Sequence, residues 1–269
     1  MTGSQSDKRK TALITGASSG IGYELAKKFA KNHHDLILVA RNLQVLHKLA
    51  DDLANQYSIS AWTLSKDLAN PASPSEIFEE LEKQSIKVDY LVNNAGFGLQ
   101  GFFWELDTQS QQEMIQVNVS ALTHLTRLFL PGMVQRKSGG ILNVASTAAF
   151  QPGPLMAVYY ASKAYVLSFT QALSNELHGT GVTATVLCPG PTRTGFQKRA
   201  RLGNSRLFRR GVMDPEPVAE AGYRGLIKGK RIVIPGLTNR ILAATVRTVP
   251  TRLVLRMVRK LNESRDNPG

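Results

Sequence analysis

The feature that most constrains the fold of this chain is the alternation of short apolar segments with longer stretches of helical periodicity. Apolar runs fall at residues 11–15, 36–40, 59–64, 88–92, 140–145, 182–188 and 232–234. Between them, apolar residues recur at helical spacing over residues 21–31, 43–53, 74–84, 108–137 and 157–179. Strands that alternate with helices form βαβ units, whose right-handed crossovers favour a doubly wound parallel sheet. The sequence therefore predicts an α/β fold, a single Rossmann-type domain with helices on both faces of a parallel sheet.

The chain shows no internal repeat or low-complexity linker, so its predicted parts belong to one domain. We expect a disordered tail over residues 1–10, a catalytic nucleotide-binding domain over 11–235 and a basic amphipathic extension over 236–269. The first residues are polar and no apolar run is long enough for a membrane helix, which favours a cytoplasmic location. Cys188 is the single cysteine and follows an apolar run, so we expect it to be buried and no disulfide to form. The histidines lack ligand spacing, and no metal site is expected.

A glycine-rich turn follows the first predicted strand and precedes the first predicted helix. Glycine allows tight turns and lets the backbone approach a ligand closely. The start of the helix offers unpaired N–H groups and the positive end of its dipole, which suit a pyrophosphate. The turn therefore predicts a dinucleotide site that includes Gly16, Ser18, Ser19, Gly20, Ile21 and Gly22.

The end of the second predicted strand indicates which dinucleotide is bound. Folds that bind NAD usually carry a carboxylate here for the ribose 2′-hydroxyl, whereas an arginine suits the 2′-phosphate of NADP. This chain has Ala40 followed by Arg41. A guanidinium pairs with phosphate through charge-assisted hydrogen bonds. A solvated surface arginine is the alternative, but the location favours NADP(H) as cofactor.

Three polar residues form a candidate catalytic group. Tyr159 and Lys163 are four residues apart in a helical stretch and share a face. A nearby ammonium lowers the pKa of a tyrosine from its ordinary value of about 10, as a general acid requires. Ser146 follows a predicted strand, at the sheet edge where ligands bind, and its hydroxyl could bond a substrate oxygen. Residues 93–96, Asn-Asn-Ala-Gly, follow another strand at that edge.

Taken together and in this order, these motifs resemble the short-chain dehydrogenase/reductase family over roughly residues 11–195. The glycine turn matches residues 15–22, the N-N-A-G element matches 93–96, and the family's catalytic residues match Asn118, Ser146, Tyr159 and Lys163. Cofactor contacts implied by the resemblance are Asp67, Leu68, Asn94, Ala95, Gly96, Tyr159, Lys163, Pro189, Gly190, Thr192 and Thr194. Ser120 and Ala145 depart from residues common in the family, but neither is a reacting group.

The resemblance implies carbonyl reduction, with hydride from NADPH and a proton from Tyr159. Ser146 would polarise the substrate oxygen, Lys163 would hold the nicotinamide ribose and lower the tyrosine pKa, and Asn118 would hold a relay water. The resemblance also implies a homo-oligomer, a dimer or tetramer. A non-catalytic NADP(H) sensor or interaction protein on the same fold is the alternative, against which the intact catalytic set argues.

The substrate is less constrained than the chemistry. Five apolar residues flank the motifs and could line a pocket, although ordinary packing would explain each one; they are Phe97, Phe150, Leu155, Met156 and Phe196. The basic segment after Gly190 has the composition of a mobile substrate lid. Residues 130–134, 140–143 and 152–155 resemble the branch with 3-ketoacyl reductases and hydroxysteroid dehydrogenases. We therefore expect a bulky, hydrophobic ketone.

The net charge of +13 lies entirely in the last third of the chain. Residues 1–190 hold 15 basic and 15 acidic residues, whereas residues 191–269 hold 18 and 5. After Pro250, basic residues follow one side of a predicted helix (Arg252, Arg256, Arg259, Lys260) and apolar residues follow the other (Leu253, Val254, Met257, Val258, Leu261). This pattern is typical of a peripheral membrane helix. A helix packed on the core with a solvated basic side is the alternative, and no nucleic-acid module accompanies the charge.

Overall fold

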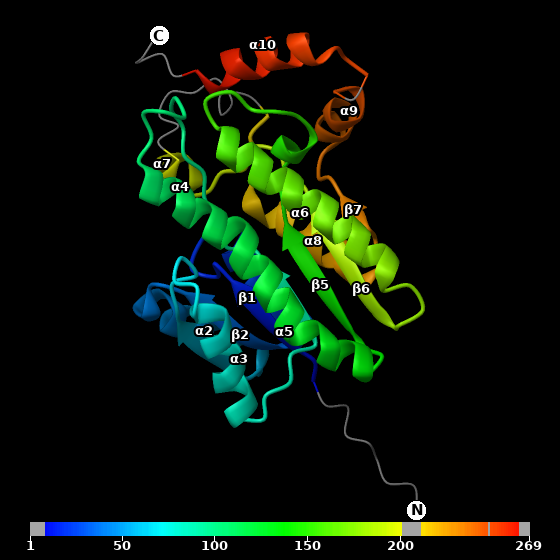
Figure 1. Ribbon diagram of the computed structural model, residues 1–269. Helices are drawn as coiled ribbons and strands as arrows, with labels where there is room; N and C mark the ends of the chain where they lie inside the picture. Colours follow the sequence, from blue (N-terminus) through cyan, green and yellow to red (C-terminus); the bar gives the residue numbers. More distant parts are fainter. Residues whose placement is uncertain (1–8, 201–210, 247, 264–269) are drawn as a thin grey trace, which may run out of the picture.

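The computed structural model describes residues 9–200, 211–246 and 248–263, and Figure 1 shows a central sheet between two layers of helices. The described strands are β1 (Thr11–Thr15), β2 (Asp35–Ala40), β3 (Ala61–Ser65), β4 (Tyr90–Asn93), β5 (Gly139–Val144), β6 (Val182–Leu187) and β7 (Ile232–Val233). All neighbours are parallel, in the order β3-β2-β1-β4-β5-β6-β7. The predicted doubly wound sheet is confirmed. Strand ends differ from those predicted by one or two residues, because periodicity marks ends poorly.

One face of the sheet is covered by α1 (Gly20–Lys31), α2 (Leu43–Tyr57) and α8 (Pro215–Ile227). Phe29 of α1 is fully buried, and its ring packs edge-on against Tyr223 of α8 at 4.9 Å between centroids. The same ring lies 5.7 Å from that of Tyr90 on β4. This aromatic cluster fixes α1, and with it the glycine turn, against the sheet.

The other face is covered by α3 (Ser73–Lys83), α4 (Thr108–Ile115), α5 (Leu122–Gln135) and α6 (Ala157–Glu176). The sequence predicted helical structure over residues 108–137, and the structure divides this stretch at one turn. Residues Gln116–Ala121 form a π-helical turn between α4 and α5. Turns of this kind are frequent at functional sites. This one contains Asn118, which is buried.

The C-terminal part consists of α9 (Leu237–Thr245) and α10 (Thr251–Asn262), and α10 lies across the end of the molecule toward which the strands point (Figure 1). Val254 and Val258 are buried in the same apolar cluster as Tyr159. Asn262 is also buried and donates from Nδ2 to the carbonyl of Pro154 at 2.9 Å. The predicted extension over residues 236–269 therefore packs on the main domain as far as it is described.

Two sequence expectations fall wholly or partly outside the described residues. The predicted N-terminal tail lies outside them up to residue 8, and the predicted lid segment lies outside them over residues 201–210. Within the described ranges, no helix is both long and apolar enough to cross a membrane. In the same ranges, no three His, Cys, Asp or Glu side chains come close enough together to hold a metal ion.

Candidate active site

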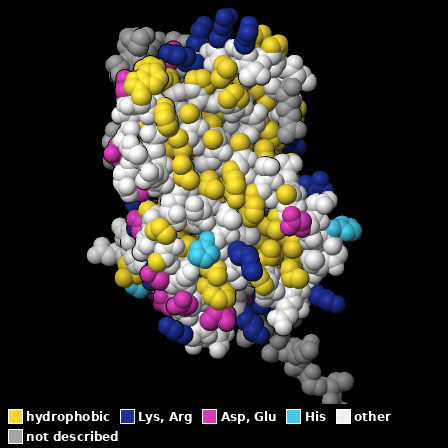
Figure 2. Space-filling model, viewed as in Figure 1, with side chains coloured by type: hydrophobic (Ala, Val, Ile, Leu, Met, Phe, Trp, Pro, Cys, Tyr) yellow, Lys and Arg dark blue, Asp and Glu magenta, His cyan; other side chains and the backbone are white. Residues whose placement is uncertain are grey.

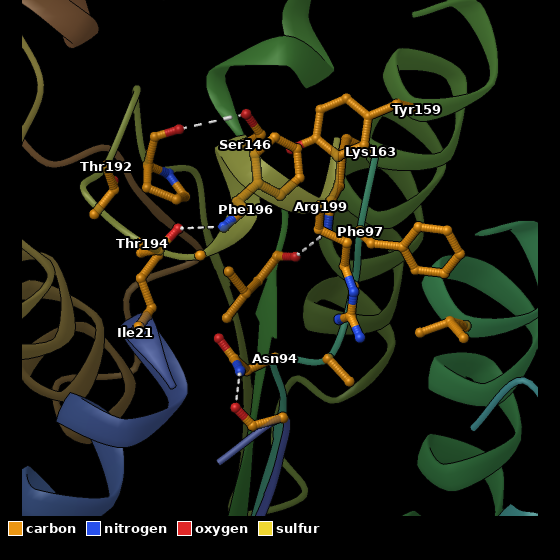
Figure 3. A pocket seen from close by; sticks show the side chains of 18 of the residues that line it. Ile21, Asn94, Phe97, Ser146, Tyr159, Lys163, Thr192, Thr194, Phe196 and Arg199 are labelled. Carbon is orange, nitrogen blue, oxygen red and sulfur yellow. Dashed lines mark hydrogen bonds between the residues drawn. The ribbon is translucent and has the colours of Figure 1, made fainter. Parts of the chain in front are cut away.

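A cavity of about 680 Å³ opens at the carboxyl edge of the sheet and reaches from the glycine turn to α6. This is an ordinary size for a cofactor or ligand site. Figure 3 shows side chains from separate segments of the chain turned toward one another there. Nearly all predicted site residues line it: Gly16, Ser18, Ser19, Gly20, Ile21, Arg41, Asp67, Leu68, Asn94, Ala95, Gly96, Ser146, Tyr159, Lys163, Pro189, Gly190, Thr192 and Thr194.

The glycine turn forms the floor of one end of the cavity. Gly16 and Gly20 have φ angles of +66° and +56°, in the left-handed region that favours glycine. The Ser19 side chain makes no capping hydrogen bond with α1. The first N–H groups of α1 therefore keep their capacity to bind an anion.

Gly22 has a packing role in the structure. It does not line the cavity. A Cβ added there would lie 2.3 Å from the carbonyl oxygen of Gly16 and 2.4 Å from Nδ2 of Asn94. The cofactor contact at this residue stays a prediction, and the structure shows that glycine is needed here because α1 packs closely against the turn.

Thr15 and Asn94 join β1 to the segment that follows β4. The Thr15 hydroxyl accepts the backbone N–H groups of Asn94 and Ala95, both at 3.0 Å. The side-chain Nδ2 of Asn94 donates to the carbonyls of Thr15 at 2.9 Å and Gly16 at 3.3 Å. The wall of the cavity between the two strands is thus fixed by polar contacts on both sides.

Arg41 and Asp67 face each other where β2 and β3 meet the cavity. Arg41 Nη1 lies 3.7 Å from Asp67 Oδ2, and the two side chains are 57% and 49% exposed. An ion pair so exposed contributes little to stability. Because a guanidinium has five N–H donors, Arg41 retains donors for a further anion.

Lys163 and Tyr159 project from α6 into the other end of the cavity (Figure 3). Lys163 is buried, donates from Nζ to the carbonyl of Val144 at 2.9 Å, and lies 5.9 Å from the centre of the Tyr159 ring. Burial lowers the pKa of its ammonium to about 8. Contrary to the lowering by Lys163 that the sequence predicted, burial raises the pKa of the Tyr159 hydroxyl above its ordinary value, which a hydrogen bond with Ser146 opposes. At neutral pH the tyrosine therefore holds its proton, and most of the lysine is charged.

Ser146 lies between β5 and the short 3₁₀ helix η2 (Thr147–Phe150). Its hydroxyl accepts the N–H of Ala148 at 3.1 Å and lies 3.5 Å from the carbonyl oxygen of Pro189, to which it can donate. The N–H of Ala148 fixes the position of the oxygen. A ligand oxygen in the cavity could replace the Pro189 carbonyl as the acceptor of the single hydroxyl proton.

Asn118 lies behind the cavity and does not line it. Its Oδ1 accepts the N–H of Phe97 at 3.1 Å, and its Nδ2 donates to the Phe97 carbonyl at 2.9 Å and the Ser162 hydroxyl at 3.0 Å. Gly96 fits beside it, because a Cβ there would lie 3.0 Å from Asn118 Oδ1 and 3.2 Å from Lys163 Nζ. Sequence reasoning missed Ser162, whose position next to Lys163 was the only signal.

Of the predicted substrate residues, Phe97, Met156 and Phe196 line the cavity. Phe196 begins the short helix α7 (Phe196–Arg199), and its ring lies 5.2 Å from that of Tyr159. Sequence reasoning missed Arg199, which also lines the cavity and lies 5.8 Å from the centre of the Phe97 ring. A basic residue within a basic segment gave no signal that would distinguish it.

Two predicted pocket residues lie elsewhere. Phe150 is outside the cavity lining and packs against the apolar cluster of Ala145, Ala149 and Val166. Leu155 lines a second cavity of about 220 Å³, which shares Leu99 and Met156 with the first. Apolar character alone could not tell these positions from those that face the cavity.

Cys188 is buried, as predicted, and burial raises the pKa of its thiol to about 12. The thiolate is the nucleophilic form. A thiol that stays protonated near neutral pH is unreactive, so this residue acts as a small buried apolar group beside the site.

The chain is similar to a known protein family and to individual members of it. A family model described as short chain dehydrogenase matches residues 10–205. The ketoacyl reductase HetN of Nostoc sp. is 34% identical over 218 residues, which is 81% of this chain and 75% of that protein.

Two solved structures resemble the chain over nearly its whole length. A short-chain dehydrogenase from Sphingobium yanoikuyae in complex with NADPH has a TM-score of 0.80 and 31% identity, covering 96% of this chain and 100% of that one. The bulky-bulky ketone specific alcohol dehydrogenase from Comamonas testosteroni has a TM-score of 0.75 and 27% identity, covering 97% and 99%. With the family model matching well over half its length, this chain belongs to the short-chain dehydrogenase/reductase family of oxidoreductases.

Proposed function

We propose that this protein reduces a bulky, hydrophobic ketone or aldehyde to an alcohol, with NADPH as the reductant and Tyr159 as the proton donor. The observation that carries the proposal is the grouping of Ser146, Tyr159 and Lys163 at one end of the cavity that begins at the glycine turn. When bound, the cofactor supplies the hydride. The residues around the cavity supply positioning and the proton.

The proton comes from a tyrosine that is neutral before the reaction. Burial keeps the Tyr159 hydroxyl protonated, so it can donate to a substrate oxygen. The ammonium of Lys163 stabilises the negative charge that then develops on the ring. The Ser146 hydroxyl donates to the same substrate oxygen while Ala148 holds it in place.

Asn118 acts as a positioning residue in this proposal. Its amide already bonds to Phe97 and Ser162. A relay water, as the family resemblance implies, would bind to the second lone pair of Oδ1.

The residues of the glycine turn fit the cofactor assignment. The N–H groups at the start of α1 suit a pyrophosphate, and Arg41 suits a 2′-phosphate at the end of β2. A family member in complex with NAD also resembles the chain. The preference for NADP(H) therefore rests on Arg41.

Replacing this arginine tests the cofactor preference. We expect Arg41→Gln to raise the KM for NADPH about tenfold or more, because a charge-assisted hydrogen bond is lost. The KM for NADH should stay within about twofold, since NADH has no phosphate for Arg41 to bind. Arg224→Gln, an exposed arginine on α8, is the matched control. An equal rise in the KM for NADPH and NADH, or no rise for either cofactor, would contradict the assignment of NADP(H).

The apolar lining supports a bulky, hydrophobic substrate such as a 3-ketoacyl or steroid-like ketone. Phe97, Leu99, Met156 and Phe196 line the end of the cavity near Tyr159. The second cavity continues beyond Leu99 and Met156 and is lined mainly by apolar side chains. The names of the ketoacyl reductase and the ketone-specific dehydrogenase point the same way.

Substrate class is tested by following NADPH absorbance with small diketones, steroid ketones and 3-ketoacyl thioesters. We expect turnover of a bulky class and little with small diketones, which leave most of the apolar surface uncovered. Preference for small diketones would refute the proposed substrate class. Intact NADPH binding without turnover of any carbonyl would favour the sensor function instead.

Two neighbouring tyrosines give a matched pair for the chemical step. Tyr159→Phe should lower kcat by about 10² to 10⁴, the usual contribution of a general acid, while NADPH still binds. Tyr160→Phe should retain kcat within about threefold, because its hydroxyl bonds to Asn262 and lies 3.3 Å from that side chain. The measurements are steady-state rates and NADPH fluorescence titration. A Tyr159→Phe enzyme with the wild-type rate would rule out the mechanism.

The buried charge of Lys163 should reduce stability. Its pKa is about 8 in the folded chain against 10.5 ordinarily, so the unfolded chain binds more protons between these values and stability rises with pH. Below pH 8, Lys163→Met should raise the free energy of unfolding, by at most on the order of 3 kcal/mol, and the gain should fade toward pH 10.5.

Urea unfolding at several pH values measures this effect. Lys228→Met, at an exposed position, is the control and should show no such dependence. A Lys163→Met variant less stable than the wild type by the same amount at every pH would contradict the prediction, because it would mean that only the bond to Val144 matters.

A further inference from the structure

The end of the molecule that bears α10 combines exposed apolar and basic side chains. Trp104 and Phe103, on the loop of residues 101–106, are 76% and 62% exposed, and Met257 of α10 is 61% exposed. Large apolar side chains with this much exposure are expensive to leave in water. Figure 2 shows Lys and Arg side chains in a row at the top, where α10 lies, with hydrophobic side chains beside them.

The helix has three faces rather than two. Val254 and Val258 face the protein and are buried. Arg252, Arg256 and Arg259 follow a second face, which meets the 101–106 loop. Leu253 and Met257, one turn apart, form a third face that is exposed. The basic stripe therefore has apolar side chains on both sides, Trp104 and Phe103 on one and Leu253 and Met257 on the other.

Loop and helix form one fixed surface. The Trp104 ring stacks on that of Phe102 at 4.8 Å, and the Arg259 guanidinium lies 5.7 Å from the Phe102 ring. The Gln100 side chain donates to the carbonyl of Asn262, whose own side chain is buried. The exposed faces are therefore held outward by contacts beneath them.

We propose that this surface, formed by α10 and the loop of residues 101–106, docks on an anionic lipid membrane. Charge complementarity selects this occupant: the surface carries four basic residues on α10 against two acidic residues, Glu105 in the loop and Glu263, which is paired with Arg259. Interfacial helices combine a basic face with Trp, Phe and Leu in this way. A second copy docked through the same surface would bring the two arginine stripes together, which like charge disfavours.

Docking would bring the lipid close to the large cavity. Val258 and Leu261 of α10 line that cavity, and Arg259 lines the second one. The wall between cavity and membrane would then be a single helix, a suitable position for a protein whose ligand dissolves in lipid. Membrane binding itself does not depend on the proposed reaction and can be measured without turnover.

The chain contains its own reporter for this test. It has two tryptophans, and in a Trp62→Phe background the emission comes from Trp104. With vesicles of phosphatidylcholine and phosphatidylglycerol, we expect a blue shift, quenching by brominated lipid and co-sedimentation. Vesicles of phosphatidylcholine alone should give little blue shift, quenching or co-sedimentation. About 0.5 M salt should reverse the binding to the anionic vesicles.

Matched variants separate the surface from general charge. Arg252→Gln with Arg256→Gln should weaken partitioning about tenfold or more, and Lys228→Gln with Lys230→Gln, at the far end of the sheet, should leave it within about twofold. Met257→Ser should weaken it more than Ile227→Ser, an exposed control on α8. Thermal melts confirm that each variant is folded.

Several results would overturn the proposal. One is a lack of binding to anionic vesicles, and another is an equal loss of vesicle binding in the control variants. A third is a shift of Trp104 emission that follows protein concentration without lipid, which would assign the surface to self-association. Binding to DNA or RNA without binding to vesicles would assign it to nucleic acid. Loss of turnover with vesicle binding retained would leave the proposal intact and count against the proposed reaction alone.

Discussion

The polar link between Thr15 and Asn94 is the contact on which both halves of the site depend. It joins β1 to the end of β4, where the chain order of the sheet reverses and the two strands leave a crevice between their ends. Gly22 packs so closely on this link that a side chain would meet both Gly16 and Asn94. The start of α1 is therefore tied to the β4 loop, and that loop continues to Phe97 and its bonds with Asn118. The anion-binding turn and the reaction end of the cavity share one anchor.

A buried network sets the position of α6 in the same way. Asn93 donates to Asn143 at 2.9 Å and to Thr126 at 3.1 Å, and Asn143 donates to Thr170 of α6 at 2.9 Å. Buried polar networks favour one arrangement, because a small shift would leave their groups unsatisfied. Thr170 lies two helical turns beyond Lys163, on the same face. The register that satisfies Thr170 thus also brings the Lys163 ammonium to the carbonyl of Val144.

Residues marked by a regular spacing or by a motif could be predicted from the sequence, and residues marked only by their apolar character could not be assigned to the cavity or to the core. Apolar runs located the strands, and the spacing of Tyr159, Lys163 and Ser146 located the reactive end of the cavity. Phe150 and Phe196 look alike in a sequence, yet one packs in the core and the other faces the cavity. The sequence does not indicate the π-helical turn at Asn118, because the helical spacing of apolar residues continues through it.

The basic helix shows why one pattern allowed two interpretations. The sequence allowed two alternatives, a helix packed on the core or a helix at a membrane. Both assume that the whole apolar side of the helix makes one kind of contact. In the structure that side is divided, since Val254 and Val258 are buried while Leu253 and Met257 are not. Packing holds the helix in place and leaves an apolar strip beside the arginines. Because the helix is already folded and held against the protein, binding to lipid would cost little conformational entropy.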